Sequence, residues 1–342
     1  MDIHSKTNSA DPRRADAFRR SLDRWFRCQG RSLPWRSTRD PYAVMVSEFM
    51  LQQTTVAAVV PFFERWMKQF PDVQALAAAD EQSVLKLWEG LGYYSRARNL
   101  HRAARAIVAQ DGIIPRSVSA LRELPGIGPY TAAAIAAFAF DECVPVLDAN
   151  IIRVVARLFD FRNPVNTAEG RIFLERAARV LLPRRGGCAH ASALMDLGAT
   201  VCRAGQPDCA ACPVQKFCSA TDPGTIPRKP ARAQTIAETD CRIFAERADG
   251  VCLVPSDGPR WRGLWLLPPG PPSDAPIHIS NYVVTRHRIR LEVARARALK
   301  AWRAFAADAL PPMPSPHRRA LEQILSGRSN RKRPPQKNSE PA

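Results

Sequence analysis

Four of the nine cysteines lie in one short segment, at Cys202, Cys209, Cys212 and Cys218, with the spacing C-x6-C-x2-C-x5-C. Four thiolates this close along a chain can surround one tetrahedral metal ion or an iron–sulfur cube. Zinc sites more often use two separated C-x2-C pairs, so the uneven spacing favours a [4Fe-4S] cluster, with zinc as the alternative. We expect the other five to be small buried apolar residues: Cys28, Cys143, Cys188, Cys241 and Cys252.

A second chemical feature is the sequence Leu124-Pro125-Gly126-Ile127-Gly128, which predicts a tight turn between two helices. The glycines permit a sharp turn whose N–H groups face outward, and the next helix, beginning near Pro129, adds the partial positive charge of its first turn. Such a turn suits a phosphate group, with Leu124, Gly126 and Gly128 as the binding residues. A purely structural turn is the alternative.

Two acidic residues stand where a carboxylate can do chemistry. Asp148, in Val146-Leu147-Asp148-Ala149-Asn150, precedes a predicted helix and can serve simply as its N-cap. Glu48 lies on an otherwise apolar helix, where it either faces solvent or is buried among Val46, Phe49 and Met50. Burial would raise its pKa and make it a general acid.

These segments together resemble the endonuclease III and MutY superfamily of DNA glycosylases. The cysteine spacing resembles the [4Fe-4S] loop of that superfamily, Leu124–Gly128 is similar to its helix-hairpin-helix, and S-E-x-M-L-Q-Q-T at Ser47–Thr54 resembles a MutY signature. The resemblance covers about Phe18 to Cys218. It implies an adenine-removing glycosylase of base excision repair that hydrolyses the N-glycosidic bond of adenine mispaired with 8-oxoguanine or guanine.

The resemblance also implies a role for each candidate residue. Glu48 protonates the leaving adenine, and Asp148, twenty residues after Gly128, stabilises the sugar cation. Tyr130 stands where bifunctional relatives have a lysine, so no Schiff base can form and the enzyme is monofunctional, with Tyr130 hydrogen-bonded to Asp148 or near the sugar.

Further positions match the family's substrate-contacting residues. Arg31, Trp35 and Arg36 resemble its adenine pocket, and we group Asn150 with them. Gln53 and Tyr93 resemble residues that wedge into the base stack when the target base is extruded. The loop from Arg203 to Lys216 is expected to press positive charge onto phosphates.

Charge agrees with a polyanionic partner. Lys and Arg number 50 against 32 Asp and Glu, a formal net charge of +18. No stretch is apolar enough for a bilayer span or a secretory signal, so we expect a cytoplasmic protein. The resemblance implies that it acts as a monomer on double-stranded DNA that contains A:8-oxoG or A:G mispairs.

The element pattern predicts a mainly α catalytic core and a small α/β second domain. Residues 1–15 and the basic tail 327–342 are expected to be disordered, 16–219 to be the helical core, 220–238 a linker and 239–326 the second domain. Helices are predicted for these ranges: 41–53, 56–70, 81–89, 95–110, 131–140, 150–159 and 317–325. Strands are predicted for 241–245, 250–254, 282–285 and 290–294.

The second domain resembles a shortened Nudix-like domain of the MutY family, which senses 8-oxoguanine. Trp261–Pro268 matches its G-L-W…P strand, and Thr285-Arg286-His287 falls where the family has a recognition loop ending in histidine. His287 is therefore a candidate DNA contact, although Thr285 and Arg286 replace the usual aromatic residue and serine. No Nudix hydrolase box occurs, and a domain that only packs is the alternative.

Two other functions stay open at this point. One is a mismatch glycosylase of the thymine-removing or endonuclease III type; Tyr130 excludes its lyase form but not its thymine-specific form. The other is a non-catalytic iron–sulfur protein that binds DNA, which would have no use for a buried acid at Glu48.

Overall fold

The computed structural model describes residues 12–228 and 234–327. The chain divides into two compact units. Unit 1 takes the chain up to Ala79 and then Arg98–Ala231, and unit 2 takes Asp80–Ala97 and the chain from Arg232 onward. The expected tail at 328–342 and residues 1–11 lie outside the described residues.

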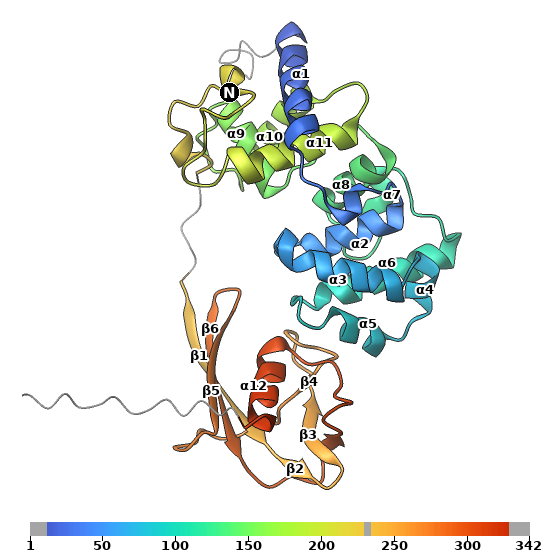
Figure 1. The fold of residues 1–342 in the computed structure, drawn as a ribbon, viewed down its shortest axis with the longest axis vertical. Coiled ribbons are helices and arrows are strands. Elements are labelled where there is room, and N and C mark those ends of the chain that lie inside the picture. Colours follow the sequence, from blue (N-terminus) through green and yellow to red (C-terminus); the bar gives the residue numbers. More distant parts are fainter. Residues whose placement is uncertain (1–11, 229–233, 328–342) are drawn as a thin grey trace, which may run out of the picture. The chain divides into compact units, whose positions relative to one another are not determined.

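Unit 1 is built of helices (Figure 1). They are α1 (Pro12–Gln29), α2 (Pro41–Leu51), α3 (Val56–Gln69), α4 (Val73–Ala78), most of α6 (Ser95–Gln110), α7 (Val118–Arg122), α8 (Pro129–Phe140), α9 (Ala149–Leu158), α10 (Ala168–Leu181) and α11 (Gly187–Asp196). Side-chain oxygens cap several helix starts, among them Asp40, Asp72, Ser117 and Thr167. The helical pattern predicted from the sequence is confirmed.

Two predicted boundaries were wrong. The first helix begins at Pro12, inside the segment expected to lack structure, because proline at the first helical position is compatible with a helix start. Helix α2 ends at Leu51 rather than Gln53, because Gln53 adopts a left-handed backbone with φ of 57°.

Helices α2 and α8 pack against each other in the middle of unit 1. Nine consecutive residues of α2, from Tyr42 to Met50, are buried, as are seven of α8, from Thr131 to Ala137. The small alanine side chains of α8 let neighbouring helices approach closely. A polar residue on either helix is therefore surrounded by protein.

The turn between α7 and α8 has the predicted form. Gly126 has φ of +76°, and a Cβ built there would lie 2.4 Å from the Cβ of Asn99. Gly128 is extended, and a Cβ there would meet nothing within 4 Å. Gly126 is thus required by the fold, whereas Gly128 leaves open space in front of the α8 N-terminus.

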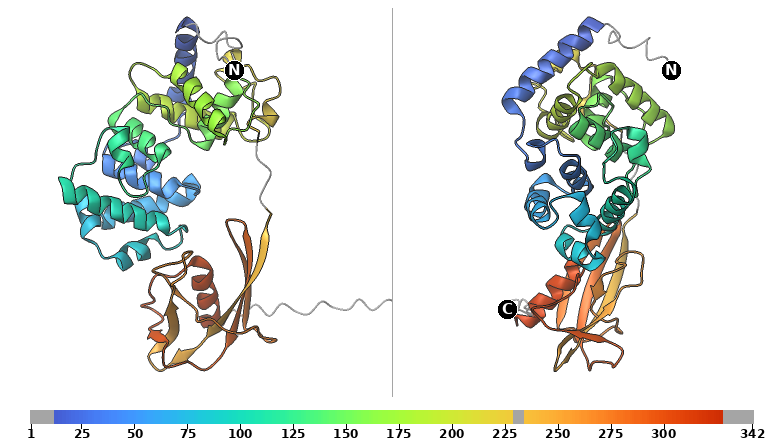
Figure 2. Two further views of the ribbon diagram at one scale, coloured as in Figure 1. Left: turned by 180° about the vertical axis from the view of Figure 1, so that it is seen from behind. Right: turned by 90° about the vertical axis from the view of Figure 1, so that its right-hand side faces the viewer.

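Unit 2 contains a sheet of β1 (Ile236–Phe244), β6 (His287–Arg295) and β5 (His278–Val284), with β1 parallel and β5 antiparallel to the central β6. Beside it, β3 (Gly250–Pro255) pairs with β2 (Glu246–Arg247), β4 (Trp265–Leu266) and β7 (Arg303–Phe305). Helix α12 (Ser315–Leu325) packs on β5 (Figure 2), and α5 (Glu81–Trp88) completes the unit. The predicted strands are confirmed but are extended by several residues in β1, β5 and β6.

The second core includes Phe244, Leu253, Leu291, Val293 and Leu321. Alternation along β6 places Ile289, Leu291 and Val293 inward and leaves Arg288 and Arg290 exposed. None of the helices in the described ranges is long and apolar enough to cross a membrane.

The two hairpin glycines give a stability prediction. Gly126→Ala forces a side chain into Asn99 at a positive φ and should lower the free energy of unfolding by about 1–3 kcal/mol. Gly128→Ala, with an extended backbone and no neighbour, is the matched control and should leave it nearly unchanged. Thermal unfolding of the two variants checks this, and equal melting temperatures would contradict the steric argument.

Candidate active site and cysteine loop

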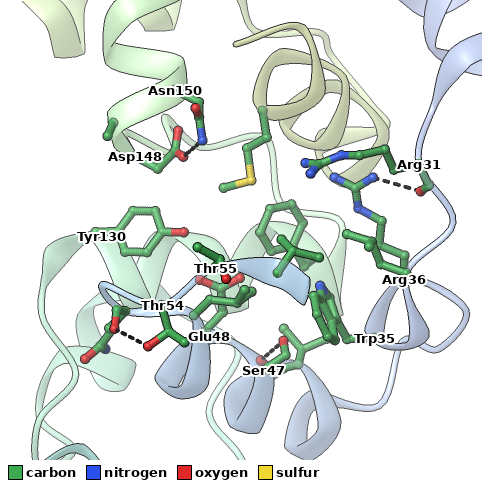
Figure 3. Close-up of a pocket in the computed structure, with 18 of the residues that line it drawn as sticks. Arg31, Trp35, Arg36, Ser47, Glu48, Thr54, Thr55, Tyr130, Asp148 and Asn150 are labelled. Atoms are coloured by element: carbon green, nitrogen blue, oxygen red, sulfur yellow. Dashed lines mark hydrogen bonds between the residues drawn. The ribbon is translucent and has the colours of Figure 1, made fainter. Parts of the chain in front are cut away.

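A cavity of about 750 Å³ lies within unit 1 (Figure 3). It is lined by residues from α2, α8, the start of α9, the turn Pro34–Arg36 and α11. It brings together eight of the residues singled out in the sequence: Arg31, Trp35, Arg36, Glu48, Gln53, Tyr130, Asp148 and Asn150. Residues separated by a hundred positions or more thus meet at one concave site.

Glu48 is 3% exposed, on the buried helix α2. Its Oε2 atom has no hydrogen-bond partner among the described residues. Burial raises the pKa of Glu48 to about 7; a hydrogen bond with Tyr130 opposes the rise, and the nearby Asp148 adds to it. A sizeable fraction of Glu48 is therefore protonated near neutral pH and can give up a proton, as a general acid must.

Asp148 is both an N-cap and a cavity residue. Its Oδ1 accepts the backbone N–H of Ile151 at 2.6 Å, and its Oδ2 accepts the Asn150 side-chain amide at 2.7 Å. The capping role expected as the simpler explanation is confirmed, and it fixes the carboxylate at the cavity wall. Asn150 contributes by orienting Asp148.

Tyr130 is the second residue of α8, and Figure 3 shows its ring between Asp148 and Glu48. Burial raises the pKa of its hydroxyl well above 10, and the two neighbouring carboxylates push it further in the same direction. The phenol stays neutral, so it can donate a hydrogen bond. Its hydrogen-bond partner is Glu48.

The opposite wall is cationic. Arg31 and Arg36 both donate to the carboxylate of Asp196, which has no exposed surface; four of these contacts measure 2.6–2.9 Å. Burial alone raises the pKa of Asp196, but the hydrogen bonds from Arg36 and Arg31 outweigh it and the net shift is downward. Trp35 packs edge-on against Phe63, with ring centroids 5.5 Å apart. These contacts hold the arginines and the indole in place.

The two residues matched to base-stack wedges share a conformation. Gln53 and Tyr93 have φ of 57° and 49°, a left-handed backbone that is uncommon for residues with a side chain. Gln53 lines the cavity in unit 1. Tyr93 belongs to unit 2, where 43% of its surface is exposed.

The remaining predicted residues lie outside the cavity lining. Leu124, Gly126 and Gly128 form the turn before α8. His287 begins β6, and its Nδ1 pairs with Glu238 of β1. Its imidazole therefore has a partner within unit 2.

The four clustered cysteines lie near one another. Burial raises the pKa of Cys212 to about 11, against a backbone hydrogen bond at Val214, and Cys202, Cys218 and Cys209 each add electrostatic repulsion. Among the described residues, no three His, Cys, Asp or Glu side chains are arranged to hold a metal ion. The expectation that the other five cysteines are buried holds only for Cys252; Cys28 is exposed, because it is near the end of α1.

Two arginines of α9 bind the start of the cysteine loop, and one of them, Arg153, also contacts a cavity residue. Arg157, 1% exposed, donates to both the carbonyl and the Sγ of Cys202, at 3.2 Å each. Arg153 donates to the Cys202 carbonyl at 2.7 Å and to Oδ1 of Asn150 at 2.8 Å. Hydrogen bonds thus run from Cys202 through Arg153 and Asn150 to Asp148.

Residues 46–175 match the family model of the HhH-GPD superfamily base excision DNA repair protein. The adenine DNA glycosylase of Mycolicibacterium smegmatis is 40% identical over 232 residues, which cover 66% of this chain and 77% of that protein. The chain belongs to the MutY family of adenine DNA glycosylases. The mouse member is 44% identical over 215 residues, 60% of this chain and 42% of its own. The chain spans less than half the length of the mammalian relatives that it matches.

Solved structures agree on the fold. A thermostable thymine-DNA glycosylase aligns with a TM-score of 0.55 and 28% identity, over 60% of this chain and 96% of its own. Endonuclease III in a non-covalent DNA complex aligns with a TM-score of 0.51 and 21% identity, over 60% and 95%. The helix-hairpin-helix glycosylase fold expected for a MutY family member is confirmed.

The sequence reasoning missed several residues of this MutY family site. Asp196 anchors both cavity arginines, and Arg153 orients Asn150, yet neither stood in a recognisable motif. A weak indication existed for Arg153, since it follows Asn150 by three positions on the same helix face. Cys188 and Met195 of α11 also line the cavity.

Glu48 predicts a pH-dependent stability difference. Its pKa is raised from 4.5 to about 7 on folding, so between these values the folded state binds the extra proton and stability falls as pH rises. The free energy of unfolding of the wild type should drop by up to about 3 kcal/mol across this window relative to Glu48→Gln, then stay level. Denaturant titrations from pH 4 to 8 measure it, and a constant difference would refute the buried acid.

Proposed function

We propose that this protein is a monofunctional adenine DNA glycosylase that removes adenine mispaired with 8-oxoguanine or guanine in duplex DNA. The observation that carries the proposal is the pairing of a buried carboxyl with a raised pKa, Glu48, and a capped carboxylate, Asp148, in one cavity. Excision needs two such groups, one that delivers a proton and one that bears negative charge. Membership of the MutY family supports adenine as the base.

In the proposed reaction the Glu48 carboxyl donates its proton to a ring nitrogen of the extruded adenine. The bond between that base and the sugar C1′ then breaks, the base takes the bonding electron pair and leaves neutral, and positive charge develops on the sugar. Asp148 faces this charge, held by the Ile151 N–H and the Asn150 amide. Water adds to C1′, its released proton restores Glu48, and an abasic site remains.

Tyr130 limits the enzyme to hydrolysis. A strand-nicking glycosylase needs an amine to form an imine with the sugar, and a phenol supplies none. The neutral hydroxyl of Tyr130 instead bonds with Glu48, so it helps to position the acid. The product is an intact strand with an abasic site.

DNA recognition divides among several segments. Arg31, Trp35 and Arg36 form the wall that receives the adenine, and their attachment to Asp196 and Phe63 keeps that wall rigid. The α7–α8 turn binds backbone phosphate through N–H groups in front of Gly128, where no side chain intervenes. Gln53 of unit 1 and Tyr93 of unit 2 are each candidates to insert into the base stack when a base is extruded.

The cysteine loop holds one [4Fe-4S] cluster, with Cys202, Cys209, Cys212 and Cys218 as ligands. Their proximity supports this, and so does the buried Arg157, whose positive charge beside Cys202 Sγ matches a thiolate. The cluster supplies structure: it fixes the loop that carries Arg203 and Lys216, which face phosphates. The uneven C-x6-C-x2-C-x5-C spacing makes zinc the weaker choice, because zinc sites more often use two separated C-x2-C pairs.

Unit 2 supplies a Nudix-like domain that senses the base opposite adenine. The turn between β5 and β6 presents Thr285, in a left-handed conformation, and Arg286 at its tip. His287 follows, held by Glu238. Arg286 is a strong donor for a guanine edge, which supports a DNA-facing role for this turn.

A second candidate is thymine removal from T:G mispairs. The likeness to a thymine-DNA glycosylase, at 28% identity, favours it, and Tyr130 is compatible with it. Glu48 favours adenine, because adenine is the base that needs protonation to leave. In a DNA-binding protein without activity, the burial of Glu48 would destabilise the fold and serve no function.

One assay separates these functions. Single-turnover excision should be seen with A:8-oxoG and A:G duplexes and be absent with T:G and thymine glycol, with strand breakage only after alkali. Glu48→Gln should reduce the rate by at least about 10²-fold, since adenine would leave as an anion, while DNA binding survives. Asp148→Asn should also lose most activity because the sugar cation loses its counter-charge. Adenine excision by Glu48→Gln at the wild-type rate would refute the mechanism.

Metal analysis tests the cluster. Purified protein should be brown and contain about four irons per chain. Cys212→Ser should lose most of that iron, whereas Cys241→Ser, a cysteine of unit 2 that is outside the loop, should keep it. One zinc and no iron in the wild type would overturn the assignment.

A further inference from the structure

The segment Asp80–Ala97 is grouped with the C-terminal residues in unit 2, although the chain separates them by more than 130 positions. Hydrogen bonds along the segment make this connection. Gln82 Nε2 donates to the Gly263 carbonyl at 3.1 Å, Lys86 Nζ to that of Leu310 at 3.0 Å, and the Tyr94 hydroxyl to that of Met313 at 2.8 Å. The segment is therefore bound to Gly263 and to the chain at Leu310 and Met313.

The strongest of these contacts joins Glu89 to Arg318 of α12. Nε and Nη2 of Arg318 donate to the two carboxylate oxygens at 2.6 and 3.1 Å, a forked arrangement. Both side chains are largely buried, 12% and 14% exposed, and Arg318 also donates to the Pro311 carbonyl at 2.7 Å. A forked pair shielded from water is much stronger and more directional than a surface ion pair.

Between the two fastened residues, Glu89 and Tyr94, lies a turn with left-handed residues at Gly90, Gly92 and Tyr93. Its inner side is filled by the buried Arg96, which donates to the carbonyls of Leu91 and Gly92 at 3.1 and 3.0 Å. The guanidinium of Arg96 also lies 5.5 Å from the centre of the Tyr93 ring. The turn is thus held from inside by Arg96 and from both ends by the C-terminal chain, with the Tyr93 ring exposed.

A left-handed backbone is unfavourable at a tyrosine and persists only where its surroundings enforce it. The surroundings here are the contacts of Glu89 and Tyr94 with residues 310–318. We propose that these contacts, with Arg318 as the positioning residue, aim the Tyr93 ring at a nucleobase of the bound duplex. The C-terminal chain then contributes to base extrusion as well as to sensing the opposite base.

This proposal rests on the proposed function, because it assumes that a base leaves the stack. An exposed aromatic ring stacks on a base of any sequence, and the gain is lost when the ring is free to move. Arg318 touches no reacting atom, so its removal should weaken extrusion and leave the chemistry of an already extruded base unchanged.

The experiment uses the full chain and a duplex with 2-aminopurine in place of the target adenine, whose fluorescence rises when the base unstacks. Arg318→Ala and Glu89→Ala should each reduce the extruded fraction and the single-turnover rate by about tenfold, the effect of losing one well-placed stacked base. Arg319→Ala, the next residue on α12, is the matched control and should behave as the wild type. Exchanging the charges, Glu89→Arg with Arg318→Glu, should restore part of the loss.

Tyr93→Ala separates positioning from general stability. In that background Arg318→Ala should cause no further loss of extrusion, because the ring that it aims is absent; a full additional tenfold loss would mean that Arg318 acts elsewhere. If Arg318→Ala does not fold, Arg318→Lys is the deciding variant, because lysine keeps the positive charge but cannot donate two parallel hydrogen bonds to Glu89. Extrusion at the wild-type level by Arg318→Lys would overturn the proposal. Failure of wild-type protein to excise adenine would instead count against the proposed function.

Discussion

A buried carboxyl group, with one oxygen that has no hydrogen-bond partner among the described residues, is the constraint on which this molecule depends. Glu48 projects from a helix that is buried along nine consecutive residues, and that helix packs on the alanine-rich α8. Desolvation favours the neutral acid, which is the form that can deliver a proton. The fold must enclose this group yet leave it a cavity to face, and the small side chains of α8 and the left-handed Gln53 at the end of α2 help to meet both demands.

On the other side of the cavity, the buried carboxylate of Asp196 is paired with arginines and stays charged. Asp196 is fully buried, but two arginines satisfy it, so it stays ionised and serves as an anchor for side chains that face the cavity. Asp148 is held by a backbone N–H and an amide, and the amide is itself held by Arg153, which reaches the cysteine loop. The carboxyl groups of Glu48, Asp148 and Asp196 thus have different hydrogen-bond partners. These partners determine whether each group acts as an acid, as a counter-charge or as an anchor.

Helix periodicity, the L-P-G-I-G turn and the apolar surroundings of Glu48 were predictable because they depend on neighbouring residues. The family resemblance supplied most of the eight predicted site residues that the cavity brings together. What the sequence did not reveal depends on long-range packing: Asp196 meets Arg31 and Arg36 across about 160 positions. The grouping of Asp80–Ala97 with C-terminal strands was equally hidden, because its helical pattern is the same whichever unit it joins. Gln53 was misplaced in a helix because its left-handed backbone has no signature in a glutamine.

The ion pair between Glu89 and Arg318 joins residues 229 positions apart, so its two partners are synthesised at different times. At roughly 5–20 residues per second, the ribosome makes Arg318 about 10–45 s after Glu89. For most of that interval the helices around Glu89 are outside the ribosome, with a carboxylate and a tyrosine whose partners have not yet been made. The nascent chain therefore passes through a state in which unit 1 can be folded while the turn that carries Tyr93 still lacks its contacts with helix α12.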